Sequence, residues 1–350
     1  MENQNYHEEL MKKNILKLRE YYRTLPAFCQ EYFLGTAQTI SSRTQLAYAF
    51  DLRVFFDYIH QFKPGYQNIN VTEFKLSILD DISRRDILNF LEYVSYYVKD
   101  GKEYTNDEKG KARKLATLRS FYRYFYRNEM IQSNPAALVD MPKIHEKEII
   151  RLDINEVVEL LDLVENGDKL TKGEKRYYEK NSLRDFTILT VMLGTGIRVS
   201  ECVGLNLSDV DIKNTRIKVT RKGGYEAFVY FGDEVCEALL SYLEERKLIQ
   251  AETGHENALF LSSRKTRMGV RNIEYMVKKY ATNVTPGKHI TPHKLRSTYG
   301  TSLYRETGDI YLVADVLGHK DVNTTKKHYA AIEEERRRMA RNAVKLREDP

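Results

Sequence analysis

The sequence predicts a mainly α-helical protein of two domains, with a small antiparallel β-sheet in the second domain. Much of the chain carries apolar residues three and four positions apart, which favours amphipathic helices. Residues 215–231 instead alternate apolar and polar side chains around a Gly-containing turn, which predicts a β-hairpin. The charged segment 141–151, which contains Pro142, predicts an interdomain linker. We therefore expect a helical domain at 1–140 and a second domain at 152–350.

Composition and charge narrow the class of protein. The 350 residues suffice for about two domains, each with its own core. The formal net charge of +6 favours a polyanionic partner. Cys29, Cys202 and Cys236 lie far apart without metal-ligand spacing, which predicts reduced thiols in the cytoplasm. We expect no signal sequence, no membrane-spanning run of ~20 apolar residues and no nucleotide-binding GxxxxGK(S/T) loop.

The N-terminal half is expected to be all-helical, because it carries no clear strand signal. Residues 1–33 are charged with interspersed apolar positions and predict one or two surface helices. A long amphipathic helix is expected to begin at Ser41, and Ser83 with Asp86 forms a capping-box pattern for the next one. A further amphipathic helix is predicted over 107–129.

Basic residues on that last helix suggest contact with nucleic acid. Arg119, Arg123 and Arg127 recur every four residues, so they form one stripe on which like charges repel. A phosphate backbone would relieve this repulsion, and an ordinary solvated helix face is the alternative. A second basic stripe is expected on a helix over 268–281. The candidate DNA-contact residues are Lys111, Lys114, Arg119, Arg123, Arg127 and Arg271.

In the C-terminal half, a capping pattern at Asp153 predicts a helix, and the polar segment 165–182 predicts a loop or a frayed helix. A buried helix is expected from Leu183, broken by Gly194 and Gly196. Beyond the hairpin, we expect an amphipathic helix over 233–248, a short buried segment at 259–261 and a charged C-terminal helix after residue 330.

Arg198 follows the glycine break and begins a new short helix. A guanidinium beside such a break, where backbone N–H groups are also free, is suited to binding phosphate. Glu201, three residues on, can orient Arg198 through an ion pair. A purely structural ion pair is the alternative interpretation.

The stretch 291–330 concentrates reactive side chains. It contains His293 and Arg296 three residues apart, His319 after a Leu-Gly break, and Tyr329. A guanidinium grips phosphate oxygens bidentately, an imidazole exchanges protons near neutral pH, and a phenol can form a covalent phosphotyrosine. A lone Tyr is usually a core residue, and this chain has 25 of them. The joint pattern nevertheless predicts metal-independent attack on a phosphodiester.

These segments resemble the C-terminal signature of the tyrosine recombinases. HKLRSTYGTSL contains that family's His-x-x-Arg, and LGHKDVNTTKKHY contains its Leu-Gly-His and its nucleophilic Tyr. The block around Arg198 is similar to the first arginine motif of the family. The resemblance implies a catalytic set supported by Glu201, namely Arg198, Lys222, His293, Arg296, His319 and Tyr329.

The resemblance also implies the chemistry. Tyr329 would attack the phosphate to give a 3′-phosphotyrosine and a free 5′-hydroxyl, with His293 as acid/base and His319 as a hydrogen-bond donor to the phosphate. Lys222, at the turn of the hairpin, would protonate the leaving oxygen. Lys218 and Arg221 lie close by, so the register of this assignment stays open. No metal and no cofactor are expected.

The implied partners are a double-stranded DNA recombination site and further copies of the chain. The N-terminal half resembles the helical core-binding domain, which clamps DNA. A homotetramer on two sites, with a dimer on each, is expected to resolve chromosome dimers at a dif-like site, and the resemblance suggests an FtsK-type DNA translocase as activator. The C-terminal helix would dock into a neighbouring subunit or pack in its own domain. Alternatives are an integrase of a phage or mobile element, a topoisomerase, and an inactive DNA-binding regulator.

Overall fold

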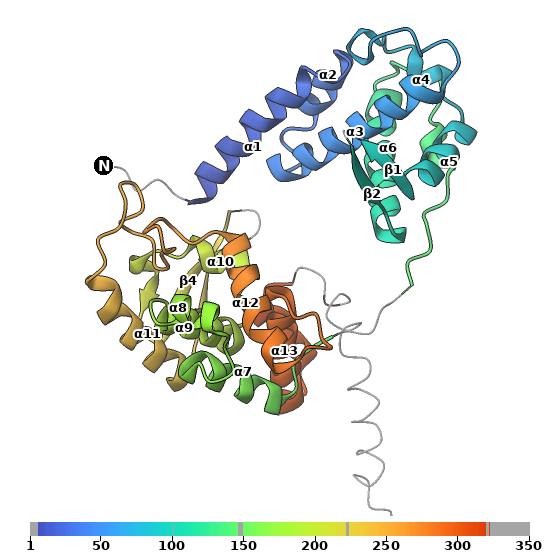
Figure 1. Cartoon of the computed structure of the whole chain (residues 1–350). Coiled ribbons are helices and arrows are strands. Elements are labelled where there is room, and N and C mark those ends of the chain that lie inside the picture. The colour runs from blue at the N-terminus through green and yellow to red at the C-terminus, as the bar shows by residue number, and fades with distance from the viewer. Residues whose placement is uncertain (1–5, 100, 146–149, 222–223, 320–321, 323–350) are drawn as a thin grey trace, which may run out of the picture. The chain divides into compact units, whose positions relative to one another are not determined.

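The computed structural model describes residues 6–99, 101–145, 150–221, 224–319 and 322. The chain divides into two compact units, Met1–Lys147 and Glu148–Pro350 (Figure 1). Helices predominate in both units, and the C-terminal unit contains a small antiparallel sheet, so the predicted fold class is confirmed. Within the described part of the chain, none of the helices combines the length and the apolar character that crossing a bilayer requires.

The N-terminal unit is a helical bundle with one hairpin. Two helix starts match the predictions: the long helix begins directly after Ser41, which accepts a hydrogen bond from the Thr44 N–H at 3.3 Å, and Ser83 with Asp86 forms the predicted capping box. The elements are α1 (Tyr6–Tyr22), α2 (Phe28–Gly35), α3 (Ser42–Phe62), η1 (Val71–Glu73), α4 (Ile78–Asp81), α5 (Arg84–Tyr93), β1 (Tyr96–Lys99), β2 (Lys102–Thr105), α6 (Glu108–Arg127) and η2 (Pro135–Leu138).

The β1–β2 hairpin contradicts the expectation that this half is all-helical. The two strands pair antiparallel with Tyr97 opposite Tyr104, whose rings stack with centroids 5.1 Å apart. Gly101 adopts φ +72° in the connecting turn, a conformation that glycine reaches without strain. Each strand has only four residues, too few for its alternation to stand out from the surrounding helical pattern.

An aromatic core fixes which face of α6 points inward. Phe121 and Phe125 are fully buried, with ring centroids 5.1 Å apart, and Phe121 makes an edge contact with Tyr32 of α2. Aromatic rings bury large apolar areas, so this face is strongly held. Positions of α6 on the opposite side, including Arg123 and Arg127, remain exposed.

The C-terminal unit is built around helix α9 (Ser182–Thr195; Figure 1). The side chains of its Ile188, Leu189 and Val191 are fully buried. The three strands form one antiparallel sheet in the order β3-β4-β5. The elements are α7 (Ile154–Asn166), α8 (Lys172–Tyr178), α9 (Ser182–Thr195), α10 (Val199–Gly204), η3 (Leu207–Asp209), β3 (Val210–Asp211), β4 (Arg216–Thr220), β5 (Glu226–Tyr230), α11 (Asp233–Lys247), α12 (Val270–Val284), α13 (Pro292–Thr307) and α14 (Ile310–Leu317).

Two local predictions for this unit need adjustment. Gly194 does not interrupt the buried helix, which continues to Thr195 and ends where Gly196 adopts φ +63°. The polar segment 165–182 contains a regular helix, α8, because Thr171 and Glu174 cap it reciprocally. The first difference arises because a glycine alone does not end a helix, whereas a left-handed C-cap does. The second arises because reciprocal capping stabilises a helix even in a polar segment.

Candidate active site

Arg198 is held at the junction between α9 and α10. It is the N-cap residue of α10, and its backbone N–H donates to Glu201 Oε2 at 2.8 Å. Its guanidinium donates to Glu201 Oε1, also at 2.8 Å, and to the Gly318 carbonyl at 3.1 Å. The side chain stays 32% exposed while Glu201 is buried, so the guanidinium is oriented yet accessible.

Arg296 reaches the same place from α13. Its guanidinium is buried and donates to the Gly196 carbonyl at 2.5 Å and to the Leu317 carbonyl. Arg198 and Arg296 therefore donate to adjacent carbonyls at the C-terminal end of α14, although 97 residues separate them in the chain. The structure thus brings the two predicted arginines together.

A third guanidinium, that of Arg221, belongs to this cluster. It donates to the Leu317 carbonyl at 2.9 Å and to the Val316 carbonyl at 3.0 Å, and lies 3.9 Å from Glu201 Oε2. The sequence suggests Arg221 only as a register alternative to Lys222. A usable signal is nevertheless present: Ile217 and Val219 are the buried positions of β4, and Arg221 continues their alternation.

The three guanidiniums converge on the C-terminal end of one helix, α14. The last carbonyls of a helix lack intrahelical partners and carry only partial negative charge. Glu201 forms ion pairs with Arg198 and Arg221. The nearby Cys202 adds no charge, because burial and, to a smaller extent, Glu201 raise the pKa of its thiol to about 12. The cluster thus keeps positive charge for an anion such as a phosphate.

The two predicted histidines lie close in sequence to residues of this cluster: His293 is three residues before Arg296, and His319 directly follows Gly318. His319 follows Gly318, which ends α14 with φ +61°, and the His319 N–H donates to the Ala314 carbonyl at 2.8 Å. His319 is therefore covalently adjacent to the carbonyl that Arg198 contacts. His293 lies one turn before Arg296 on α13, with an exposed side chain. The predicted Lys222 and Tyr329 lie outside the described residues.

Apolar packing sets the position of α14 against α13. Tyr304 of α13 and Val313 and Leu317 of α14 form a buried cluster. A side chain at Gly196 would collide with the Tyr299 ring at 2.3 Å, so α9 and α13 approach closely at this point. This packing places the C-terminal end of α14 within hydrogen-bond distance of Arg198, Arg221 and Arg296.

The candidate DNA-contact residues of α6 do not share one environment. Lys114 is buried: its Nζ donates to Asn106 Oδ1 at 3.0 Å and lies 3.5 Å from Asp51 Oδ1. Arg119 donates to the backbone carbonyls of Ala136 and Val139, which fastens η2 to α6. The prediction that Lys114 lies on an exposed, DNA-facing surface is therefore wrong, because it is committed to a core ion pair.

The remaining candidates are accessible. Arg123 and Arg127 are exposed and line a cavity of about 460 Å³ together with Thr36 and Thr39. Lys111 is half-buried, and Arg271 is exposed on α12 of the other unit. Two guanidiniums one turn apart beside hydroxyl groups form a surface suited to phosphate oxygens.

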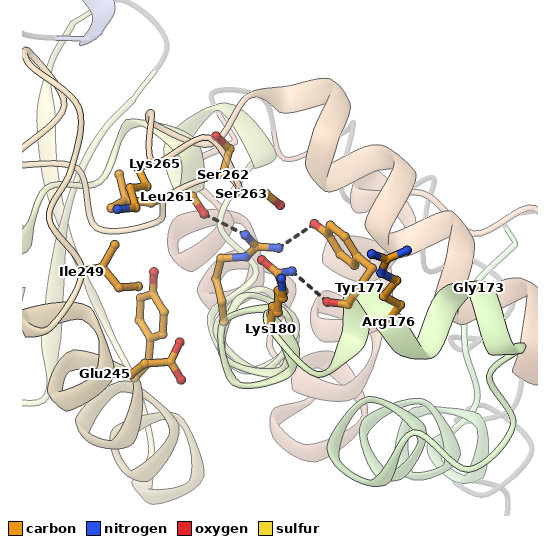
Figure 2. Close-up of a pocket in the computed structure, with 13 residues that line it drawn as sticks. Gly173, Arg176, Tyr177, Lys180, Glu245, Ile249, Leu261, Ser262, Ser263 and Lys265 are labelled. Carbon is orange, nitrogen blue, oxygen red and sulfur yellow. Dashed lines mark hydrogen bonds between the residues drawn. The ribbon is translucent and has the colours of Figure 1, made fainter.

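A cavity of about 500 Å³ in the C-terminal unit is separate from the arginine cluster. Its wall includes Tyr177 and Lys180 on one side and Ile249 and Lys265 on the other (Figure 2). A buried arginine, Arg184, spans the wall by donating to the Tyr177 hydroxyl and the Leu261 carbonyl, both at 2.8 Å. None of the three clustered arginines lines this cavity, so it is not part of the arginine cluster.

No group of three or more His, Cys, Asp or Glu side chains in the described ranges is arranged to hold a metal ion. What the described residues do provide is a set of guanidiniums around one helix end, directly before His319 in the chain. Such a set suits stabilisation of the charge that develops when a phosphodiester is attacked.

The comparison with known proteins identifies that class of enzyme. Residues 151–336 match the family described as the phage integrase family. The chain belongs to this family, the tyrosine recombinases, and is a DNA strand-transfer enzyme.

Known recombinases are similar to this chain in sequence, and solved recombinase structures share its fold. The tyrosine recombinase XerC of Caldanaerobacter subterraneus subsp. tengcongensis is 30% identical over 335 residues, covering 93% of this chain and 88% of that protein. XerD of Staphylococcus epidermidis is 29% identical over 312 residues, covering 89% and 96%. The structure of XerH site-specific recombinase bound to palindromic difH substrate shares the fold, with a TM-score of 0.66 at 16% identity over 98% of this chain and 90% of that one. The Tn1549 transposon integrase with transposon right end DNA gives 0.64 at 20% identity, covering 90% and 99%.

Proposed function

We propose that this tyrosine recombinase resolves chromosome dimers by cutting and rejoining DNA at a dif-like site. The observation that carries the catalytic part is the meeting of Arg198 and Arg296 on adjacent carbonyls of α14, directly before His319. This arrangement supports a single phosphate-binding centre built from distant parts of the chain.

In the first step, the guanidiniums neutralise the scissile phosphate. Arg198, which is oriented by Glu201 and still accessible, would contact a non-bridging oxygen. Arg296 and His319 would complete the set of donors. Donors that are preorganised where charge develops are each worth ~2.7–4 kcal/mol of barrier, because they need no rearrangement as the reaction proceeds.

In the second step, the Tyr329 oxygen bonds to phosphorus while the bond from phosphorus to the 5′-oxygen breaks. The phenol, with an ordinary pKa near ~10, gives its proton to His293. The departing 5′-oxygen takes a proton from the Lys222 ammonium, so it leaves as a hydroxyl. The phosphodiester energy is kept in the 3′-phosphotyrosyl bond. A 5′-hydroxyl from a partner duplex then reverses the step and joins the strands.

The cellular role and the partners are proposals that rest on the relatives. XerC and XerD are among the similar proteins. In our reading of the sequence, the layout with a long N-terminal extension resembles XerS, a single-protein chromosome dimer recombinase. We propose a homotetramer on two DNA sites, with a dimer on each, in the cytoplasm, and activation by an FtsK-type translocase. In this proposal the N-terminal unit is the core-binding DNA clamp, 141–151 the linker, and the C-terminal unit the catalytic domain.

The second candidate function is integration or excision of a mobile element. The likeness to the Tn1549 transposon integrase, with a TM-score close to that of XerH, keeps it in consideration, since the fold does not distinguish the two roles. Deleting the gene in its host tests the choice. Dimer resolution predicts an increase in cells with unseparated nucleoids, whereas unchanged division together with loss of excision of a resident element supports the alternative.

The chemistry is tested with a nicked suicide DNA substrate built on the sequence that the protein protects in footprinting of the chromosome terminus region. The wild-type chain is expected to give a covalent protein–DNA adduct. Tyr329→Phe should bind the same DNA without forming the adduct. A wild-type protein that binds this DNA but gives no adduct would instead indicate an inactive DNA-binding regulator.

A further inference from the structure

Arg221 occupies a constrained position directly after the central strand β4. Only 5% of its side chain is exposed, and its guanidinium spans two successive carbonyls, Val316 at 3.0 Å and Leu317 at 2.9 Å. Its backbone is also fixed, because its N–H donates to the Tyr225 carbonyl at 2.8 Å and its carbonyl accepts from the Gly224 N–H at 3.0 Å. The residue therefore joins the hairpin to the end of α14.

The contact between Arg221 and Gly318 is close-packed. A Cβ built on Gly318 would lie 2.7 Å from Arg221 Nη1 and 2.8 Å from its Cζ. Gly318 also adopts φ +61°, so glycine relieves both steric and backbone strain at this position. The guanidinium of Arg221 is thus enclosed between the helix end and Glu201, and it is not available to contact DNA directly.

We propose that Arg221 is a positioning residue that locks the C-terminal turn of α14 against the Arg198–Arg296 pair. It shares the Leu317 carbonyl with Arg296, and the next carbonyl, that of Gly318, is the acceptor for Arg198. Fixing this turn fixes both catalytic guanidiniums through their common support. The inference rests on the proposed phosphate-binding roles of Arg198 and Arg296.

The physical reason is that α14 is too short to hold its own end rigidly. It has eight residues, and its last carbonyls have no intrahelical donors. Without Arg221, the Val316 carbonyl loses the donor that reaches it from the hairpin, and the turn that carries Gly318 and His319 gains freedom. A catalytic group displaced by as little as about 1 Å can cost on the order of 10²-fold in rate.

The test compares single-turnover cleavage of two forms of the same site, one with an ordinary scissile phosphate and one with an uncharged methylphosphonate. A methylphosphonate lacks the charge that the arginine pair neutralises. Arg221→Gln is expected to slow cleavage of the ordinary site by about 10–100-fold while DNA affinity stays unchanged. On the methylphosphonate site its deficit relative to wild type should shrink to about threefold or less, on the scale set by such positioning effects.

The matched control is Arg216→Gln, which removes an arginine of the same strand that pairs with Asp211 at the surface. It should cleave both sites at the wild-type rate. If Arg221→Gln does not fold, Arg221→Lys, which keeps the charge but lacks the planar pair of Nη donors, should give the same two-substrate pattern.

The inference is overturned if Arg221→Gln is slowed equally on both sites, which would indicate a general folding defect, or if either Arg221 variant cleaves the ordinary site at the wild-type rate. Arg198→Ala separates this failure from failure of the proposed function. If the cleavage deficit of Arg198→Ala relative to wild type is also no smaller on the methylphosphonate site, the assignment of the phosphate-binding arginines is wrong. The failure then extends beyond the role of Arg221.

Discussion

Arg198 and Glu201 hold each other twice, since both the backbone N–H and the guanidinium of Arg198 donate to the two carboxylate oxygens of Glu201, each at 2.8 Å. The same carboxylate thereby caps the start of α10 and orients the guanidinium that we propose binds the scissile phosphate. Local helix capping and active-site geometry are consequently one interaction in this enzyme.

Glu201→Gln should impair catalysis more than binding. The amide can still accept one hydrogen bond, but it removes the charge that pairs with Arg198 and Arg221. We expect cleavage to fall by about 10–100-fold, and the free energy of unfolding to fall by about 1.5–3 kcal/mol, the usual contribution of hydrogen bonds to charged groups. Suicide-substrate kinetics and denaturant unfolding measure the two effects. Wild-type kinetics in this variant would show that Glu201 does not aim Arg198.

Lys222→Ala should remove the general acid. Such a loss typically slows the reaction by about 10²–10⁴-fold on ordinary DNA. A substrate with sulfur in place of the 5′-bridging oxygen has a leaving group that needs no proton, so this variant should cleave it at nearly the wild-type rate. Comparing the cleavage rates of Lys222→Ala and the wild type on the two substrates tests whether Lys222 is the general acid.

Lys218→Ala is the matched variant for that experiment, because Lys218 lies in β4 and pairs with Glu226 at 3.1 Å. It should behave as wild type on both substrates. If Lys218→Ala, and not Lys222→Ala, shows the deficit that sulfur restores, the register of the general acid must be moved to Lys218.

Lys114→Met should destabilise the protein without a direct effect on DNA binding. Lys114 is buried beside Asp51, and burial lowers the pKa of this lysine and raises that of the aspartate. Removing the cation leaves Asp51 with Arg113 and Thr117 as partners, at a cost of about 2–3 kcal/mol. Denaturant unfolding can be followed by tyrosine fluorescence, since the chain has 25 Tyr and no Trp. Unchanged stability with weaker DNA binding would restore Lys114 as a DNA contact.

Arg123→Gln should weaken DNA binding without changing the stability of the protein. Its side chain is exposed beside Arg127, so stability should not change. If it neutralises one phosphate, the slope of log binding constant against log salt should become shallower by about 1. Arg119→Gln, four residues earlier on the same helix, should lower stability because Arg119 fastens η2 through backbone carbonyls. An unchanged salt slope in Arg123→Gln would remove it from the DNA interface.

Predictions from sequence succeed where the physical cause is local. The Ser83–Asp86 capping box depends on four consecutive residues and is present as expected. Lys114 is wrongly predicted although a local signal exists: it shares the helical face of Leu118 and Phe121, and that spacing indicates burial. For this residue, position on the helix is a better guide to its environment than its basic character.

Features that depend on contacts between distant segments cannot be predicted from local sequence patterns. The proximity of Arg198 and Arg296 is expected only through the resemblance to the tyrosine recombinases, since no local pattern connects α10 with α13. The role of the α14 carbonyls cannot be predicted, because main-chain acceptors leave no trace in residue identity. The β1–β2 hairpin escapes prediction because its pairing depends on packing such as that of Tyr97 with Tyr104.

The acceptors for Arg198, Arg221 and Arg296 at the end of α14 are oxygens of the peptide backbone. Substitutions on the outward face of this helix, for example at Tyr311, therefore leave the hydrogen-bond acceptors of the arginines unchanged. Helix length is a stricter requirement. Inserting or deleting one residue would rotate the terminal carbonyls by about 100° around the helix axis. All three arginines would then lose their hydrogen-bond acceptors.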